Sequence, residues 1–149
     1  MSRSGYSDDG DDQWGLIRWR GAVRSAMRGK RGQAFARELI AALDALPEKR
    51  LIAHDLIKDG EVCAIGAVGL ARGDDMSDLN PDFSEGVADH FGIARALVCE
   101  IEHINDDDFS YETHYYQDKE GIYHRRDETP EKRFIRVRAW AEQWSAPLP

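Results

Sequence analysis

Residues 51–68 read LIAHDLIKDGEVCAIGAV, and this stretch decides the predicted fold class. Two apolar runs, 51–57 and 62–68, are rich in branched residues and flank the polar residues 58–61. The Asp-Gly pair at the centre is a strong signal for a two-residue turn between antiparallel strands. Both predicted strands carry apolar side chains on both faces, so we expect helices or a partner chain to cover both sides of the hairpin.

Helical patterns lie on either side of this hairpin. Apolar residues at helical spacing predict helices at residues 14–28, 35–46, 81–92, 93–105 and 130–144. Asn80 and Thr129 each precede a proline that would stand in the first helical turn, which is typical of a capped helix start. The predicted fold is therefore α+β: a mainly helical single domain with a small antiparallel hairpin flanked by helices.

Two segments fall outside this scheme. Residues 1–12 contain four aspartates and few apolar side chains, so we predict a flexible acidic arm ahead of one globular domain at 13–149. Residues 111–116 and 122–124, joined through 118–121, form either a second hairpin or a loop.

The composition predicts a soluble intracellular domain. A chain of 149 residues with 42% apolar side chains fits one domain with its own core. Cys63 and Cys99 have apolar neighbours and no CxxC spacing, so we expect core thiols in a reduced cytoplasm. No apolar run reaches the roughly 18 residues of a membrane helix, so we expect no membrane partner. We expect packed terminal segments because they hold all four tryptophans, Trp14, Trp19, Trp140 and Trp144.

Charge is sorted by segment. Residues 13–50 hold nine Lys/Arg and three Asp/Glu, whereas residues 51–112 hold three Lys/Arg and fifteen Asp/Glu. The formal net charge of the whole chain is −8. The cations gather in what we call the basic corner, with the predicted contact residues Arg18, Arg20, Arg24, Arg28, Lys30 and Arg31. Three interpretations are open. These charges pair with residues 51–112, which we call the acidic middle, or stay solvated; they bind a protein; or they bind nucleic-acid phosphates.

An acidic run, Asp106, Asp107 and Asp108, follows the predicted helix 93–105 and is also assigned to partner binding. Anions at a helix C-terminus oppose the helix dipole, so we expect a cation or a basic side chain beside them. With His103, His114 and His124 the run could be imagined as a metal site, but the spacing matches no compact ligand motif. Surface histidines and a solvated acidic run are the preferred interpretation.

Motifs for catalysis are not found in the sequence. It contains no nucleophile-elbow, phosphate-loop or dinucleotide fingerprint, and we place Gly66 and Gly69 inside a strand rather than at a strand-to-helix turn. We therefore predict no enzymatic activity, no cofactor and no metal.

Four blocks carry a resemblance to known proteins: SGYSDD (4–9), IRWRGAVRSAMRGKRGQAF (17–35), GEVCAIGAVG (60–69) and ETPEKRFIRVRAW (128–140). They resemble blocks of small uncharacterised acidic proteins encoded by tailed phages and prophages. The resemblance implies a phage or prophage origin and transfers no activity.

Together these observations predict a non-enzymatic phage or prophage accessory protein that binds a host or phage protein. The resemblance makes inhibition of a host defence a special case of this function. The alternative is a nucleic-acid-associated protein that uses a helix-turn-helix-like corner at residues 18–31. The oligomeric state is open and a homodimer is compatible with the sequence.

Overall fold

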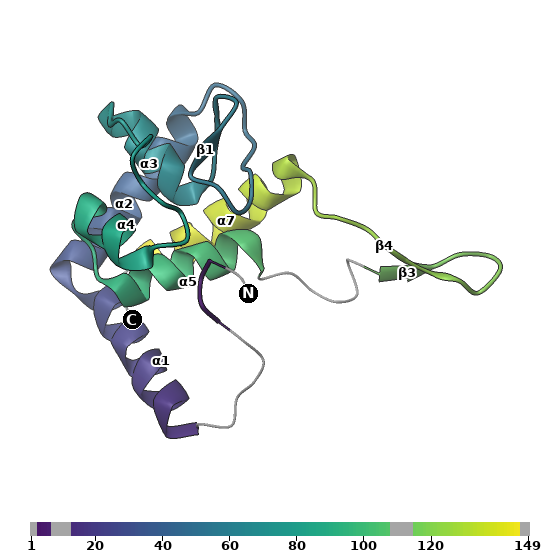
Figure 1. Ribbon diagram of the computed structural model, residues 1–149, viewed down its shortest axis with the longest axis horizontal. Helices are drawn as coiled ribbons and strands as arrows, with labels where there is room; N and C mark the ends of the chain where they lie inside the picture. Colours follow the sequence, from purple (N-terminus) through teal and green to yellow (C-terminus); the bar gives the residue numbers. More distant parts are fainter. Residues whose placement is uncertain (1–2, 7–12, 108–114, 147–149) are drawn as a thin grey trace.

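The computed structural model describes residues 3–6, 13–107 and 115–146 (Figure 1). Within these residues the predicted mainly helical α+β fold is confirmed, with six helices and two separate two-stranded antiparallel sheets. The helices are α1 (Gln13–Arg28), α2 (Lys30–Ala45), α3 (Ala64–Arg72), α4 (Ser84–Phe91), α5 (Arg95–Asp106) and α7 (Pro130–Ser145). The strands are β1 (Ile57–Lys58), β2 (Glu61–Val62), β3 (Tyr115–Gln117) and β4 (Tyr123–Arg125).

Helices α1 and α2 meet at a sharp corner with Gly29 as the one residue between them. The turn predicted over residues 29–32 is shorter than expected, because Lys30 already belongs to α2. Gly32 in the first turn of α2 allows the close approach, since a Cβ at this position would lie 1.8 Å from the Ala26 carbonyl oxygen. The absence of a side chain at Gly32 therefore allows the two helices to pack this closely.

The first predicted hairpin has the expected turn, but its strands are much shorter than predicted. Asp59 and Gly60 have φ values of 53° and 80°, as a type I′ turn requires. Pairing is limited to two residues on each side, with Lys58 opposite Glu61. The run at 51–57 is otherwise irregular.

This irregular run is held by backbone hydrogen bonds to other segments. The Ile52 N–H donates to the Val62 carbonyl at 2.9 Å, and the Leu51 N–H donates to the Pro130 carbonyl at 3.1 Å. Leu51 and Leu56 are buried in the core. The apolar residues of 51–57 thus reach the interior without forming the long strand that their pattern predicts.

The prediction of a strand over residues 62–68 is wrong, because helix α3 begins at Ala64. An unbroken apolar run fits a buried strand and a buried helix equally well. All residues from Ala64 to Gly69 are buried, so this part of the helix has no polar face that would show its period. Gly66 is helical, and a Cβ there would lie 2.0 Å from the Leu56 carbonyl oxygen. α3 therefore packs directly on the backbone of the irregular run.

Helices α4 and α5 follow the predicted order, and both begin two or three residues later than predicted. Asn80 stabilises a turn rather than a helix start, since its Oδ1 accepts the Asp82 N–H at 2.9 Å and α4 begins only at Ser84. Gly92, at φ 71°, closes α4 as expected. α5 corresponds to the helix predicted at 93–105.

The flexible acidic arm predicted for residues 1–12 is wrong for residues 3–6. Arg3 and Ser4 are 6% and 2% exposed. Tyr6 joins two helices, because its hydroxyl donates to Glu100 of α5 at 2.7 Å and accepts the Trp19 indole N–H of α1 at 2.8 Å. Residues 1–2 and 7–12 lie outside the described residues. Local composition missed these contacts because most of the partner side chains lie far along the chain.

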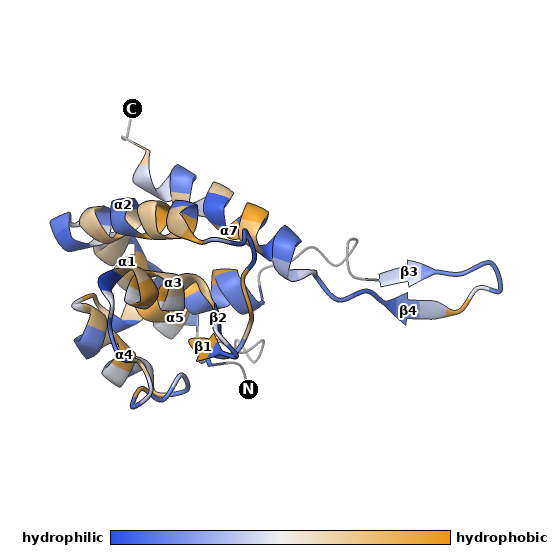
Figure 2. Cartoon of the chain, turned by 90° about the horizontal axis from the view of Figure 1, so that it is seen from above, coloured by the Kyte–Doolittle hydropathy of each residue, from blue (hydrophilic) through white to orange (hydrophobic). Residues whose placement is uncertain are grey.

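Helix α7 closes the core on the side of α2 (Figure 2). Thr129 caps it as predicted, with the Thr129 Oγ1 accepting the Lys132 N–H at 3.2 Å. Trp144, near its end, is buried at 7% exposure. The expected packing of the terminal tryptophans is wrong for Trp14, which is 74% exposed on the part of α1 that extends beyond the other helices.

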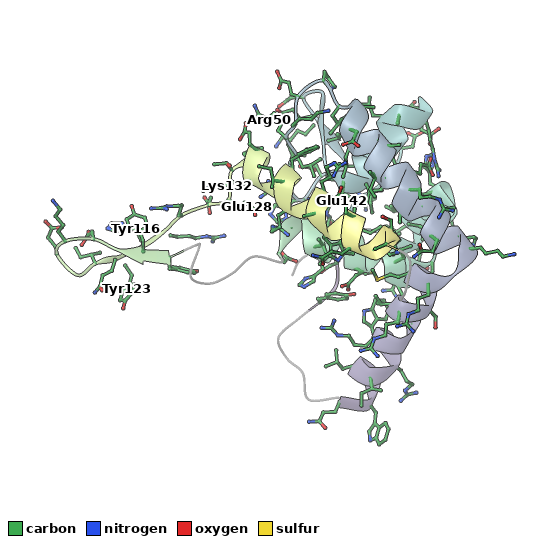
Figure 3. The ribbon with its side chains drawn as sticks, turned by 180° about the vertical axis from the view of Figure 1, so that it is seen from behind. Arg50, Tyr116, Tyr123, Glu128, Lys132 and Glu142 are labelled. Atoms are coloured by element: carbon green, nitrogen blue, oxygen red, sulfur yellow. The ribbon has the colours of Figure 1, made fainter. Side chains whose placement is uncertain are left out.

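A second hairpin is confirmed where it is described, with β3 paired to β4; residues 111–114 lie outside the described residues. It stands away from the helices (Figure 1). The register places Tyr116 opposite His124 and Gln117 opposite Tyr123, so Tyr116 and Tyr123 point to opposite faces (Figure 3). Both tyrosines are exposed.

Candidate protein-interaction surface

All six cations of the basic corner are exposed on α1 and the first turn of α2. Among the described residues, no carboxylate oxygen lies within 4.0 Å of their side-chain nitrogens. Two arginines outside the basic corner are paired with carboxylates: Arg72 with Glu38 and Arg138 with Asp44, each at 2.6 Å. The described part of the acidic middle therefore leaves the basic corner unpaired.

One face of α1 combines cations with exposed apolar side chains. Ile17, Arg20, Arg24 and Arg28 recur at intervals of three or four residues, which places them on one side of the helix. Ile17 is 60% exposed, and Trp14 stands one turn before it. We call Trp14, Ile17, Arg20, Arg24 and Arg28 the α1 face. Apolar groups at one end and guanidinium groups at the other give this face two kinds of contact.

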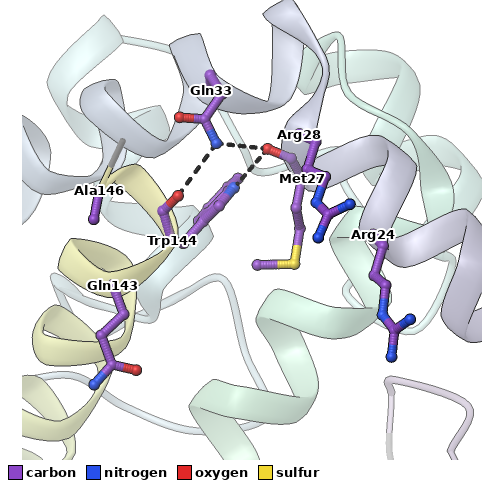
Figure 4. Close-up of a pocket in the computed structure, with 7 residues that line it drawn as sticks. All are labelled: Arg24, Met27, Arg28, Gln33, Gln143, Trp144 and Ala146. Atoms are coloured by element: carbon purple, nitrogen blue, oxygen red, sulfur yellow. Dashed lines mark hydrogen bonds between the residues drawn. The ribbon is translucent and has the colours of Figure 1, made fainter. Parts of the chain in front are cut away.

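A cavity of about 440 Å³ adjoins the cationic end of the α1 face, between α1, α2 and the end of α7. Figure 4 shows Arg24 and Arg28 on one side of it, Gln143 and Ala146 on the other, and Met27 and Trp144 between them. Gln33 completes the lining. This size falls within the range of sites that bind small molecules.

Hydrogen bonds hold the walls of this cavity together. The Gln33 Nε2 donates to the carbonyls of Met27 (2.8 Å) and Trp144 (3.2 Å). The Trp144 Nε1 donates to the same Met27 carbonyl at 3.0 Å. One residue from each of three helices is thereby fixed, so the cavity is formed before any partner binds.

The remaining cations lie on the other side of the corner. Lys30 and Arg31 line a smaller cavity of about 200 Å³ against Ile93 and Leu97. Arg18 is exposed on α1 and lines neither cavity. The basic corner is thus one exposed region that spans two cavities.

The acidic run is only partly exposed where the structure describes it. Asp106, predicted to bind a partner, is 6% exposed and pairs with Arg3. Asp107 is partly buried, with its Oδ2 3.8 Å from the His103 Nδ1. Asp108 lies outside the described residues. The basic side chain expected beside this run is present, and it comes from the segment predicted to be flexible.

The predicted roles of cysteine and histidine can be compared with their positions. Cys63 and Cys99 are buried, which confirms them as core residues, and burial raises the pKa of Cys99. His124 contacts Asp118 at 2.6 Å, His103 lies beside Tyr6, and His114 is not described. Within the described ranges, no three His, Cys, Asp or Glu side chains converge as metal ligands would.

Sequence reasoning found Arg24 and Arg28 and missed the cavity beside them. The sequence pattern places Met27 and Trp144 only among the apolar positions of predicted helices. Nothing in the pattern indicates that Gln33 or Gln143 lines a site. The chain matches no protein-family model, no curated protein and no solved structure. Within the described residues, no helix has the length and apolar character needed to span a bilayer.

Proposed function

We propose that this protein is a non-enzymatic binding protein that recognises an acidic surface of a host or phage protein through the α1 face and the basic corner. The observation that carries the proposal is the set of six exposed cations without a carboxylate partner among the described residues. Like charges at i, i+4 spacing repel one another mildly, and an anionic partner relieves this repulsion. Exposed apolar residues beside the cations supply the anchors that protein interfaces use.

Two features favour a protein partner over nucleic acid. The helix-turn-helix motif of DNA-binding proteins joins its helices by a turn of three or four residues, whereas α1 and α2 are joined through Gly29 alone. A net charge of −8 opposes non-specific binding to a polyanion. Trp14 and Ile17 add apolar contact area that phosphate binding does not require.

The setting of this function is part of the proposal. The resemblance to phage and prophage proteins supports an origin in a phage genome and action in the host cytoplasm, where Cys63 and Cys99 stay reduced. A small binding protein acts by occupying a surface of its partner. Inhibition of a host-defence protein is the special case that we propose within this class.

The test compares two triple variants that change the charge equally. The first, called the α1 variant, removes the three arginines of the α1 face by Arg20→Gln, Arg24→Gln and Arg28→Gln. The second, the control, removes three exposed cations elsewhere by Lys58→Gln, Lys119→Gln and Lys132→Gln. Each is used for affinity capture from bacterial host lysate with and without nuclease, and the captured protein is then purified for binding assays. We expect the α1 variant to bind the captured protein at least tenfold more weakly than the unmodified protein, and the control to bind it less than threefold more weakly. The melting temperatures of both variants should change little.

Salt dependence separates the two partner classes. For a protein partner with charge at the rim, added salt should slow association and leave dissociation nearly unchanged. For nucleic acid, a log-log slope steeper than about −4 corresponds to four or more phosphate contacts. That slope, together with nuclease-sensitive capture and no protein partner, would overturn the proposal.

A further inference from the structure

The cavity between α1, α2 and α7 is a specific anchoring site. We propose that it receives one large apolar side chain of an acidic peptide segment of the partner, while Arg24 and Arg28 bind the carboxylates that flank this side chain. This inference rests on the proposed function, since it names the chemistry of the segment that the basic corner recognises. The groups that line the cavity determine this chemistry.

The interior of the cavity suits an apolar group. Met27 and Trp144 present a thioether and an indole ring toward it (Figure 4). The single indole donor of Trp144 is used by the Met27 carbonyl. The Gln33 amide nitrogen has two donors, and both are used by backbone carbonyls. A charged group placed deep in the cavity would lose water without gaining these donors, whereas an apolar side chain loses nothing.

The edge of the cavity suits an anion. Arg24 and Arg28 are exposed, one helical turn apart, and among the described residues neither lies within 4.0 Å of a carboxylate. A guanidinium group binds a carboxylate through two parallel hydrogen bonds. An apolar interior with a cationic edge therefore selects a hydrophobic residue with Asp or Glu beside it.

Residues of α1 outside the cavity offer further contacts to the same partner segment. Arg20 and Ile17 continue the same side of α1 away from the cavity. An extended acidic segment anchored in the cavity would run along the α1 face and meet cations first and apolar residues after them. Preformed walls keep the entropy cost of this binding low.

The probes are fluorescein-labelled peptides Asp-Glu-X-Glu-Asp, in which X is Leu, Trp or Gly. Affinity is measured by fluorescence anisotropy with the full chain. We expect the Leu and Trp peptides to bind at least about tenfold more tightly than the Gly peptide, because their side chains are buried. Ala146→Trp, at the exposed edge of the cavity, should abolish this preference by filling the cavity. Ala139→Trp, at an exposed position of α7 outside the cavity, should retain it.

A second measurement uses the unmodified protein, so its result does not depend on whether the Ala146→Trp variant folds. The indole N–H resonance of Trp144 should shift on addition of the Leu peptide and stay in place with the Gly peptide. Equal binding of all three peptides, sensitive to Arg24→Gln with Arg28→Gln and insensitive to Ala146→Trp, would overturn the inference and leave the proposed function intact. No binding of any acidic peptide, with tight binding of a labelled single-stranded oligonucleotide, would overturn both.

Discussion

Arg3 and Asp106 form a buried two-point ion pair across 103 residues of sequence. The Arg3 Nε donates to Oδ2 of Asp106 at 2.7 Å, and the Arg3 Nη2 donates to Oδ1 at 3.0 Å. Each side chain is 1% exposed. Asp106 also accepts the His54 N–H and the Asn105 amide, so this carboxylate fastens the N-terminal segment to the end of α5 and to the irregular run at 51–56.

The first prediction concerns this pair. Arg3→Met keeps the apolar stem of the side chain, removes the guanidinium group and leaves Asp106 as a buried anion without its cation. Removing one partner of a buried pair costs about 3–5 kcal/mol, so the free energy of unfolding measured by urea denaturation should fall by that amount. Arg125→Met is the matched control, because Arg125 and Asp127 are 63% and 83% exposed and such pairs contribute about 0–1 kcal/mol. Equal losses for the two variants would contradict this role of Arg3.

Glu102 lies one helical turn before Asp106 and is fully buried. Neither of its carboxyl oxygens has a hydrogen-bond partner among the described residues. Burial raises the pKa of Glu102 to about 8, although the charge of Arg3 acts in the opposite direction. Burial also opposes ionisation of Asp106, but the hydrogen bond and charge of Arg3 outweigh it, so the pKa of Asp106 is lowered.

The second prediction is a pH dependence of stability. Between about pH 5 and 8 the folded protein keeps the Glu102 proton that the unfolded chain releases, so stability should fall as the pH rises, by at most about 1.4 kcal/mol per pH unit. The lowered pKa of Asp106 acts only in acid, where its stabilising effect is lost as the pH falls. Glu102→Gln should flatten the slope between pH 5 and 8 in urea denaturation, and Glu85→Gln, at an exposed position, should preserve it. An unchanged slope in Glu102→Gln would refute this assignment.

The sequence predicts those elements whose causes are local. The Asp59-Gly60 turn depends on two adjacent residues and the Thr129 cap on a contact three residues away, and both are found as predicted. The acidic end of α5 even indicates that a cation must lie beside it. It cannot indicate that Arg3 supplies this cation, because the contact forms only when the whole fold is present.

Two of the errors come from packing that is not visible in the local sequence. Residues 62–68 are apolar on every side because residues 64–69 of α3 are all buried, and burial on all sides removes the periodicity that separates a helix from a strand. The anchoring cavity was missed for a related reason, since Met27 and Trp144 are 117 residues apart and meet only after α7 has packed on α2. Arg24 and Arg28 were found because their spacing along one helix is itself a local signal.

The third prediction tests the close packing of α3. Gly66→Ala would place a methyl group 2.0 Å from the Leu56 carbonyl oxygen, and the surrounding backbone must move. We expect a loss of about 1–3 kcal/mol in the free energy of unfolding, typical of overpacking. Gly21→Ala is the control within exposed α1, where the added Cβ has no atom within 4 Å apart from its chain neighbours and the backbone of its own helix. It should stabilise the protein by about 0.5–1 kcal/mol. Stabilisation by both changes would contradict the packing of α3 against the irregular run.

The last prediction concerns the β3–β4 hairpin, which is supported mainly by its own contacts. Tyr116 stacks on His124 with ring centroids 5.2 Å apart, and the Arg126 guanidinium lies 4.8 Å from the Tyr116 ring centroid. An isolated two-stranded hairpin is only marginally stable in water, so its amides should exchange with deuterium orders of magnitude faster than those of α5. Gly121→Ala strains the turn, where φ is 83°, and should speed exchange in the hairpin further while the melting temperature of the protein stays within a few degrees. Protection of the hairpin equal to that of α5, rising with protein concentration, would contradict an independent hairpin and show that a second copy of the chain covers it.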